Sequence, residues 1–280
     1  MSGSPEPLTE GERWTRGELA RLRDAGWTPP ATLAFLLAAQ ARANLTRRGR
    51  PALGRQEARW MLAGALAWVP AARRLPGAQI ARARARGLLW WAGCALMLDW
   101  HLGMLETPEG GAVGLGPADA LTLLRAWLVP AVAQRAHPAL VLVGALTDIA
   151  DGRVARATRC TRLGRDLEGL VDACFAAAAL RGAVRAGGLS PLPALLERVR
   201  LLAGVGYVSS AYFTSARAPD RVAGRGERFA APVRMAGLIA AGLGRRKRAD
   251  QLLLSGSALA IIGRLGRTGG PGAVPRAGRR

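Results

Sequence analysis

Four acidic residues in one stretch of the chain have a spacing that could hold a divalent cation. Asp148 and Asp151 are three residues apart, and Glu168 and Asp172 are four apart, so on helices each pair lies on one face. Two such faces brought together would place four carboxylates around one point. This is costly unless divalent cations neutralise the charge, so the spacing predicts a metal site.

The remaining metal-binding residue types narrow the choice of metal. The chain has only two histidines, His101 and His137, and its cysteines, Cys94, Cys160 and Cys174, lie far apart without a CxxC pair. A zinc site or a disulfide framework is therefore not expected. Because carboxylates would be the ligands, we expect Mg²⁺ or Mn²⁺.

The residues around these acids form a longer pattern. Its fixed positions are Asp148-x2-Asp151-Gly152-x2-Ala155-Arg156, followed by Gly164-x3-Glu168-x3-Asp172. The pattern resembles the signature of the CDP-alcohol phosphatidyltransferases, D-x2-D-G-x2-A-R-x8-G-x3-D-x3-D, and its first half matches at every fixed position.

Two departures separate this chain from the signature. Seven residues instead of eight lie between Arg156 and Gly164, and Glu168 stands where the family has its third aspartate. Asp166 follows Gly164 by only two residues and breaks the register of the second helix, so we expect Glu168 to take the role.

A second match precedes the acidic motif by one helix. Thr122 and Arg125, with Asp119 before them and Pro130 after, resemble the P-N-x-x-T-x-x-R run of the family's first transmembrane helix. Together the two matches cover residues 116–267, the part expected to form the transferase-like membrane domain.

The resemblance implies roles for individual residues. Asp148, Asp151, Glu168 and Asp172 would hold one or two divalent metals on the CDP diphosphate, and Asp172 would also be the catalytic base that deprotonates the acceptor. The residues expected to bind substrate are Gly152, Ala155, Arg156, Gly164, Thr122 and Arg125.

The resemblance also implies the reaction. A phosphatidyl (phosphoalcohol) group would move from a CDP-linked lipid, such as CDP-diacylglycerol, to an alcohol acceptor in phospholipid biosynthesis, with release of CMP. The sequence does not identify the acceptor. A prenyl-diphosphate enzyme would need a DDxxD pair, which the chain lacks. The remaining alternative is a non-enzymatic Arg-rich membrane protein or an inactive relative, which the shortened spacing and Glu168 keep open.

The elements that must position these residues are predicted to be helices. Alternating strand patterns are absent, and six apolar blocks follow the Gly- and Pro-rich residues 106–117. We therefore expect an all-α polytopic membrane protein of about six transmembrane helices, with the acidic motif bridging the second and third. The expected helices are 120–136, 138–154, 167–186, 192–216, 230–244 and 251–266.

The first 115 residues are expected to form an Arg-rich helical extension. Residues 32–43 and 60–72 are too short to span a bilayer, whereas 88–105 is a candidate for an extra membrane segment. Residues 1–30 do not have the pattern of a secretory signal. Residues 268–280 form a basic tail rich in Gly and Pro.

The charge of the chain is strongly basic, with a formal net charge of +21 and Lys247 as its only lysine. Nucleic acid is not expected as a partner, because no recognisable binding motif accompanies the arginines. The basic segments 153–165 and 245–248 are both candidates for the cytoplasmic side. We expect an integral protein of a bacterial-type plasma membrane, in contact with lipid and able to form a homodimer, with its active site facing the cytoplasm.

Overall fold

The structure, a computed structural model, describes residues 8–74, 80–107, 109–214 and 225–268. Within these ranges the chain is helical, and an isolated bridge between Glu106 and Ala112 is the one strand-like pairing. The extension contains α1 (Glu10–Asp24), α2 (Pro29–Gly49), α3 (Pro51–Arg73), α4 (Ile80–Trp100) and the short 3₁₀ helix η1 (Leu102–Met104). The rest forms α5 (Pro117–Gln134), α6 (Pro138–Ala157), α7 (Arg162–Arg185), α8 (Pro191–Thr214), α9 (Arg225–Gly242) and α10 (Arg246–Thr268).

Local sequence signals explain where several helices begin. Proline occupies the first turn of α2, α3, α5 and α6, where its fixed φ suits a helix and its missing N–H is not needed. Thr9 and Glu12 form a capping box at the start of α1. The hydroxyl of Thr161 accepts a hydrogen bond from the N–H of Gly164 at the start of α7.

The prediction of an all-α chain, with six helices after residue 116, is confirmed. Helix α7 begins at Arg162 instead of residue 167, because the Thr161 cap starts it earlier. Helix α1 was not predicted. In the expected segment 88–105, the α-helix ends at Trp100 and the 3₁₀ helix η1 follows. Leu102 and Leu105 there are fully buried. The tail lies, from residue 269 on, outside the described residues.

The length and hydropathy of the helices bear on the prediction that they span a membrane. No helix in the described part of the chain has both the length and the hydropathy needed to cross a bilayer.

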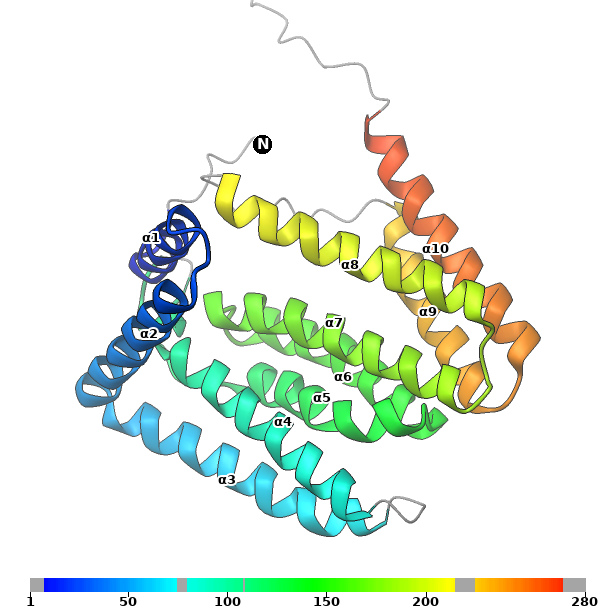
Figure 1. Cartoon of the computed structure of the whole chain (residues 1–280), viewed down its shortest axis with the longest axis horizontal. Helices are drawn as coiled ribbons and strands as arrows, with labels where there is room; N and C mark the ends of the chain where they lie inside the picture. The colour runs from blue at the N-terminus through cyan, green and yellow to red at the C-terminus, as the bar shows by residue number, and fades with distance from the viewer. Residues whose placement is uncertain (1–7, 75–79, 108, 215–224, 269–280) are drawn as a thin grey trace, which may run out of the picture.

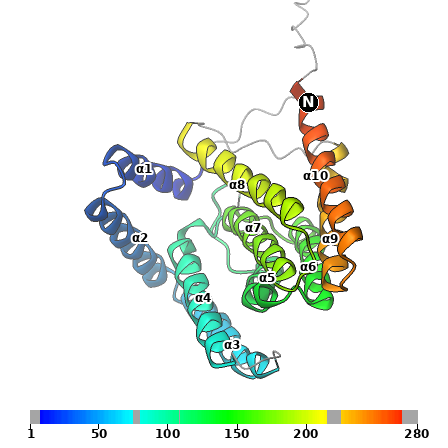
Figure 2. The same ribbon diagram turned by 45° about the vertical axis from the view of Figure 1, so that its right-hand side comes forward.

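Helix α5 lies at the centre of the fold and packs against α4, α6 and α7 (Figure 1). Indole N–H groups join it to the extension: Trp90 on α4 donates to the carbonyl of Ala126, and Trp127 donates to the carbonyl of Gly64 on α3. Figure 2 shows the same layering, with α3 and α4 on one side of α5 and the hairpin of α9 and α10 on the other.

Two large hydrophobic cores, and a small cluster of Trp68, Ala72 and Ala131, lie among the described residues. One joins α5–α10, with Val132, Phe175 and Leu180 almost fully buried. The other joins α3, α4 and η1 to α5 and α7, and its buried members are Leu53, Met61, Trp91, Leu98, Leu102, Met104, Leu105, Leu115, Leu123, Ala126, Leu163 and Val171. The extension and the helix that carries Glu168 therefore share one core.

The turns α5–α6, α7–α8 and α9–α10 meet at one end of the bundle, called here the turn end, and the turn α6–α7 lies at the opposite end beside α1 and α2 (Figure 1). Backbones touch at the turn end: a Cβ on Gly182 would lie 2.0 Å from the carbonyl oxygen of Val132, and one on Gly242 would lie 2.2 Å from that of Ala136. The basic segments 153–165 and 245–248 lie at these opposite ends. Helices that crossed a bilayer would therefore place the two segments on opposite sides, and which of the two candidates faces the cytoplasm stays a prediction.

Candidate metal centre

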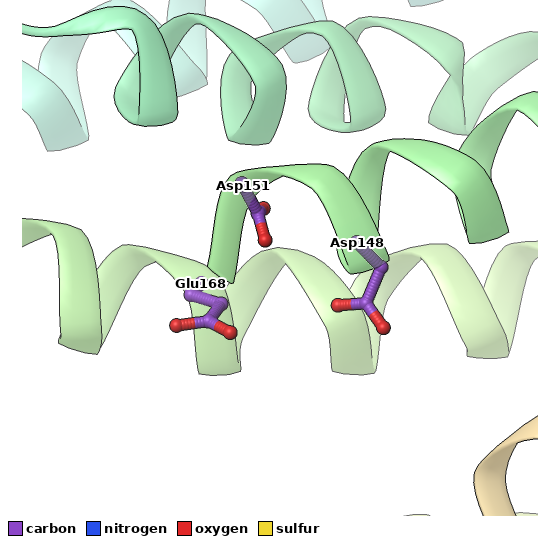
Figure 3. Close-up of side chains that lie close together, drawn as sticks. All are labelled: Asp148, Asp151 and Glu168. Carbon is purple, nitrogen blue, oxygen red and sulfur yellow. The ribbon is translucent and has the colours of Figure 1, made fainter. Parts of the chain in front are cut away.

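Three helices supply the candidate site. Helix α6 carries Asp148 and Asp151 towards its C-terminal end, α7 carries Glu168 in its second turn, and α5 packs across both. Figure 3 shows the three acidic side chains at the facing turns of α6 and α7. One carboxylate oxygen from each of Asp148, Asp151 and Glu168 lies within 4.8 Å of the others.

The donor set of this group fits a hard divalent cation. All three ligand atoms are carboxylate oxygens, which Mg²⁺ and Mn²⁺ prefer. Asp151 is 3% exposed, and its Oδ1 has no hydrogen-bond partner among the described residues. A buried anionic oxygen without a partner is costly, so this atom is suited to metal coordination.

Arg125 on α5 supplies positive charge at the centre of the site. It is 1% exposed, its Nη2 lies 2.8 Å from Asp151 Oδ2 and 3.6 Å from Asp148 Oδ1, and its Nε lies 2.7 Å from Asp172 Oδ1. One guanidinium thus faces three carboxylates, which compensates charge that would otherwise oppose folding. Among the described ion pairs, Asp148 and Asp151 pair with Arg125 and not with the arginines of residues 153–165.

Two threonine hydroxyls complete this network. Thr122 on α5 donates to Asp151 Oδ2 at 2.9 Å, and Arg125 Nη1 donates to Thr147 Oγ1 at 3.4 Å. The structure places Thr122 and Arg125 against the acids, and their predicted binding of substrate stays a prediction. The sequence reasoning missed Thr147, whose position directly before Asp148 was the available signal.

Asp172 lies beside the group without belonging to it. Its carboxylate lies against Arg125, and its side chain is 41% exposed, whereas that of Asp151 is 3% exposed. Asp148, at 42%, is as open as Asp172. The site therefore has a buried floor, formed by Asp151 and Arg125, and an open side formed by Asp148 and Asp172.

The remaining predicted residues lie around the site in different ways. A Cβ on Gly152 would lie 3.4 Å from Arg156 Nη1. Arg156 is exposed and Ala155 is half-buried. A Cβ on Gly164 would lie 2.8 Å from Thr161 Oγ1 and 3.2 Å from Asp119 Oδ1. Gly164 thus allows close packing of α7 on α5, and the substrate contact predicted for it stays a prediction.

Asp166, the rejected alternative to Glu168, lies outside the group of three acids. Its Oδ1 is 3.6 Å from Arg165 Nε.

Comparison with known proteins gives one match. Residues 116–262 match the family model described as CDP-alcohol phosphatidyltransferase. The searches of curated proteins and of solved structures gave no significant match. The matched segment contains α5–α9 and most of α10, and thus every member of the acidic site.

Proposed function

The chain belongs to the CDP-alcohol phosphatidyltransferase family, and from this premise we propose that it transfers a phosphoalcohol group from a CDP-linked lipid to an alcohol acceptor in phospholipid biosynthesis. The observation that carries the proposal is the grouping of Asp148, Asp151 and Glu168 within 4.8 Å, inside the matched segment.

In this reaction the oxygen of the acceptor hydroxyl forms a bond to the phosphorus of the phosphoalcohol group. The bond from that phosphorus to the oxygen of CMP breaks, and CMP leaves with the electron pair. A divalent cation held by Asp148, Asp151 and Glu168 would neutralise the diphosphate.

The residues of the chain have separate tasks in this scheme. Asp172, on the open side of the site, accepts the proton of the acceptor hydroxyl, a role worth roughly 10²–10⁴ in rate. Thr122 and Arg125 hold Asp151 in place through hydrogen bonds of 2.9 and 2.8 Å. Exposed Arg153, Arg156 and Arg159 at the end of α6 provide positive charge that attracts the anionic donor.

We also propose that α5–α10 lie in a membrane. Many large apolar side chains on α6 and α8 are exposed, and apolar surface left open in this way fits contact with lipid. They include Leu142, Val143, Leu146 and Ile149 on α6, and Leu192, Leu195, Leu196, Val199, Leu202, Val205 and Val208 on α8. The bacterial-type plasma membrane, the cytoplasmic orientation of the site and a homodimer remain predictions.

The alternative, a non-enzymatic or inactive relative, rested on Glu168 and on the shortened spacing. The carboxylate of Glu168 reaches the same group as Asp148 and Asp151 despite both departures, which favours the enzyme.

The test is CMP release by the purified full-length chain with CDP-diacylglycerol and a panel of alcohols, including glycerol 3-phosphate and an inositol phosphate. We expect release with one acceptor, dependent on Mg²⁺ or Mn²⁺ and abolished by excess EDTA. CMP release that persists in EDTA would contradict the metal assignment, and absence of release with every acceptor would favour the inactive relative.

A further inference from the structure

A buried charged junction joins α1, which is far in sequence from the acidic motif, to the start of α7. Glu12 is 5% exposed, and its Oε1 lies 2.7 Å from Arg165 Nη2 and 3.6 Å from Arg162 Nη1. Arg162, the first residue of α7, is 3% exposed. The other oxygen of Glu12 accepts a hydrogen bond of 2.9 Å from the N–H of Thr9.

The carboxylate of Glu12 is held in its charged form. Burial raises its pKa, but the N–H of Thr9 and the guanidinium groups of Arg162 and Arg165 outweigh burial, so the net pKa lies below the ordinary value. A buried ion pair of this kind tolerates the loss of one partner poorly, because the opposite charge stays behind. The junction is therefore a firm attachment.

Backbone and apolar contacts reinforce the junction. The N–H of Arg162 donates to the carbonyl of Glu106 at 3.0 Å, and a Cβ on Gly11 would lie 2.9 Å from Glu106 Oε1. Leu163 is 2% exposed and belongs to the core that contains Leu102. The first turn of α7 thus packs into the N-terminal extension, which lies outside the matched family segment.

The same turn determines the position of Glu168. Glu168 follows Arg165 by three residues, which places it about one helical turn further along α7. Two segments hold this turn: Asp119 of α5 packs against Gly164, and Glu12 of α1 pairs with Arg165. A shift of α7 along its axis would move Glu168 relative to Asp148 and Asp151 on α6.

We propose that Glu12 is a positioning residue for the metal site: through Arg162 and Arg165 it fixes the start of α7 so that Glu168 reaches Asp148 and Asp151. The inference rests on the proposed function only in that it takes these three acids as the ligands. It gives the N-terminal extension a task in the chemistry of the matched segment. An attachment that merely stabilised the fold would leave the metal affinity of the folded protein unchanged.

The test measures Mn²⁺ affinity directly, by electron paramagnetic resonance on the purified full-length chain. Glu12→Gln keeps the size of the side chain and removes its charge, and Glu10→Gln, at an exposed position of the same helix, is the matched control. We expect Glu12→Gln to weaken Mn²⁺ binding about 10-fold, as loss of a supporting partner does at other metal sites, and Glu12→Asp to recover part of it. Glu10→Gln should stay within about twofold of wild type. Equal affinities in Glu12→Gln and Glu10→Gln would overturn the proposal.

Arg165→Gln removes the same ion pair from the other side. It should weaken Mn²⁺ binding to a similar extent, and the double variant Glu12→Gln/Arg165→Gln should be no weaker than the single ones, because the two residues act as a unit. Additive losses would count against the proposal, and failure of both single variants to fold would mark the junction as purely structural and overturn it. Wild-type protein that binds Mn²⁺ but releases no CMP would contradict the proposed function. The Mn²⁺ affinities of the variants would still decide the role of Glu12.

Discussion

The two ends of the six-helix bundle are both rich in arginine, but they use it in different ways. At the end formed by the turn α6–α7, Arg125 and Arg162 are buried and each lies against carboxylates. At the turn end, Arg135, Arg185 and the four residues 245–248 are exposed. Density of positive charge along the sequence therefore does not locate the site. What locates it is charge that is buried and paired.

The ends also differ in what holds their helices together. Buried ion pairs and hydrogen bonds join α5, α6 and α7 around Asp151. At the turn end, glycines let backbones touch, such as Gly182 against Val132, and the described hydrogen bonds of Asp250 and Ser190 are only partly buried. Changes of charge should thus act mainly at the first end and changes of volume mainly at the second. Four predictions, from the largest effect to the smallest, test this contrast.

Asp151→Asn should have the largest effect. It removes charge from the buried floor of the site, and we expect CMP release to fall on the order of 10³-fold, as loss of several kcal/mol of charge stabilisation implies. The matched change at the turn end is Asp250→Asn, since Asp250 accepts hydrogen bonds from the N–H and the hydroxyl of Ser190 at 2.9 and 2.5 Å. It should cost about 1–3 kcal/mol of stability and leave CMP release per folded molecule unchanged. Similar losses of CMP release in the two variants would break the contrast.

Arg125→Gln should destabilise the protein most when metal is absent. Three carboxylates then lose the guanidinium that faces them, which should cost about 3–5 kcal/mol. Thermal unfolding in EDTA measures this loss. Added Mn²⁺ should raise the midpoint of the variant more than that of wild type, because the cation replaces the missing charge. An unchanged midpoint in EDTA would show that Arg125 does not compensate the acids.

Gly182→Ala and Gly164→Ala add the same methyl group at opposite ends. At Gly182 the new Cβ would lie 2.0 Å from a backbone oxygen, so we expect a loss of about 1–3 kcal/mol in stability with unchanged Mn²⁺ affinity of the folded fraction. At Gly164 the contacts are with the side chains of Thr161 and Asp119, which can move, so the expected loss is in Mn²⁺ affinity. Thermal unfolding and Mn²⁺ titration of both variants distinguish the two, and the reverse pattern would refute the division.

Arg245→Gln and Lys247→Gln should have the smallest effects. Both residues are exposed at the turn end, and exposed substitutions of this kind usually change stability by less than about 0.5 kcal/mol. Mn²⁺ affinity and CMP release should match wild type. A marked fall in CMP release would mean that the turn end takes part in the reaction.

The sequence was sufficient for the helices of the bundle and for the grouping of three of the four acids, and insufficient for their surroundings. The separation of Asp148 and Asp151 by three residues fixes a common face on any helix, and Glu168 lies beside them in the structure whereas Asp166 does not. That Glu168 and its neighbours bind metal remains a prediction. Local periodicity is enough to place side chains within one helix.

What the sequence did not give depends on how one helix is rotated against another. The packing of α5 places Thr122 and Arg125 in contact with Asp151, and no spacing in the sequence predicted this contact. That the two residues bind substrate stays a prediction. Helix α1 and the pairing of Glu12 with Arg165 have no local signal beyond the Thr-x-x-Glu pattern of a capping box. Such relations form only when the chain is folded, so spacing alone could not reveal them.

The contact between Glu12 and Arg165 also sets an order of events during biosynthesis. The two residues are 153 positions apart in the chain, and ribosomes add about 5–20 residues per second. Glu12 is therefore added roughly 8–30 s before Arg165, with which it pairs, has been made. Until the start of α7 is made, Glu12 has neither Arg162 nor Arg165 to bind, although Asp148 and Asp151, which precede them in the chain, have already been added. The extension is thus made first but can dock only once translation has passed the start of α7.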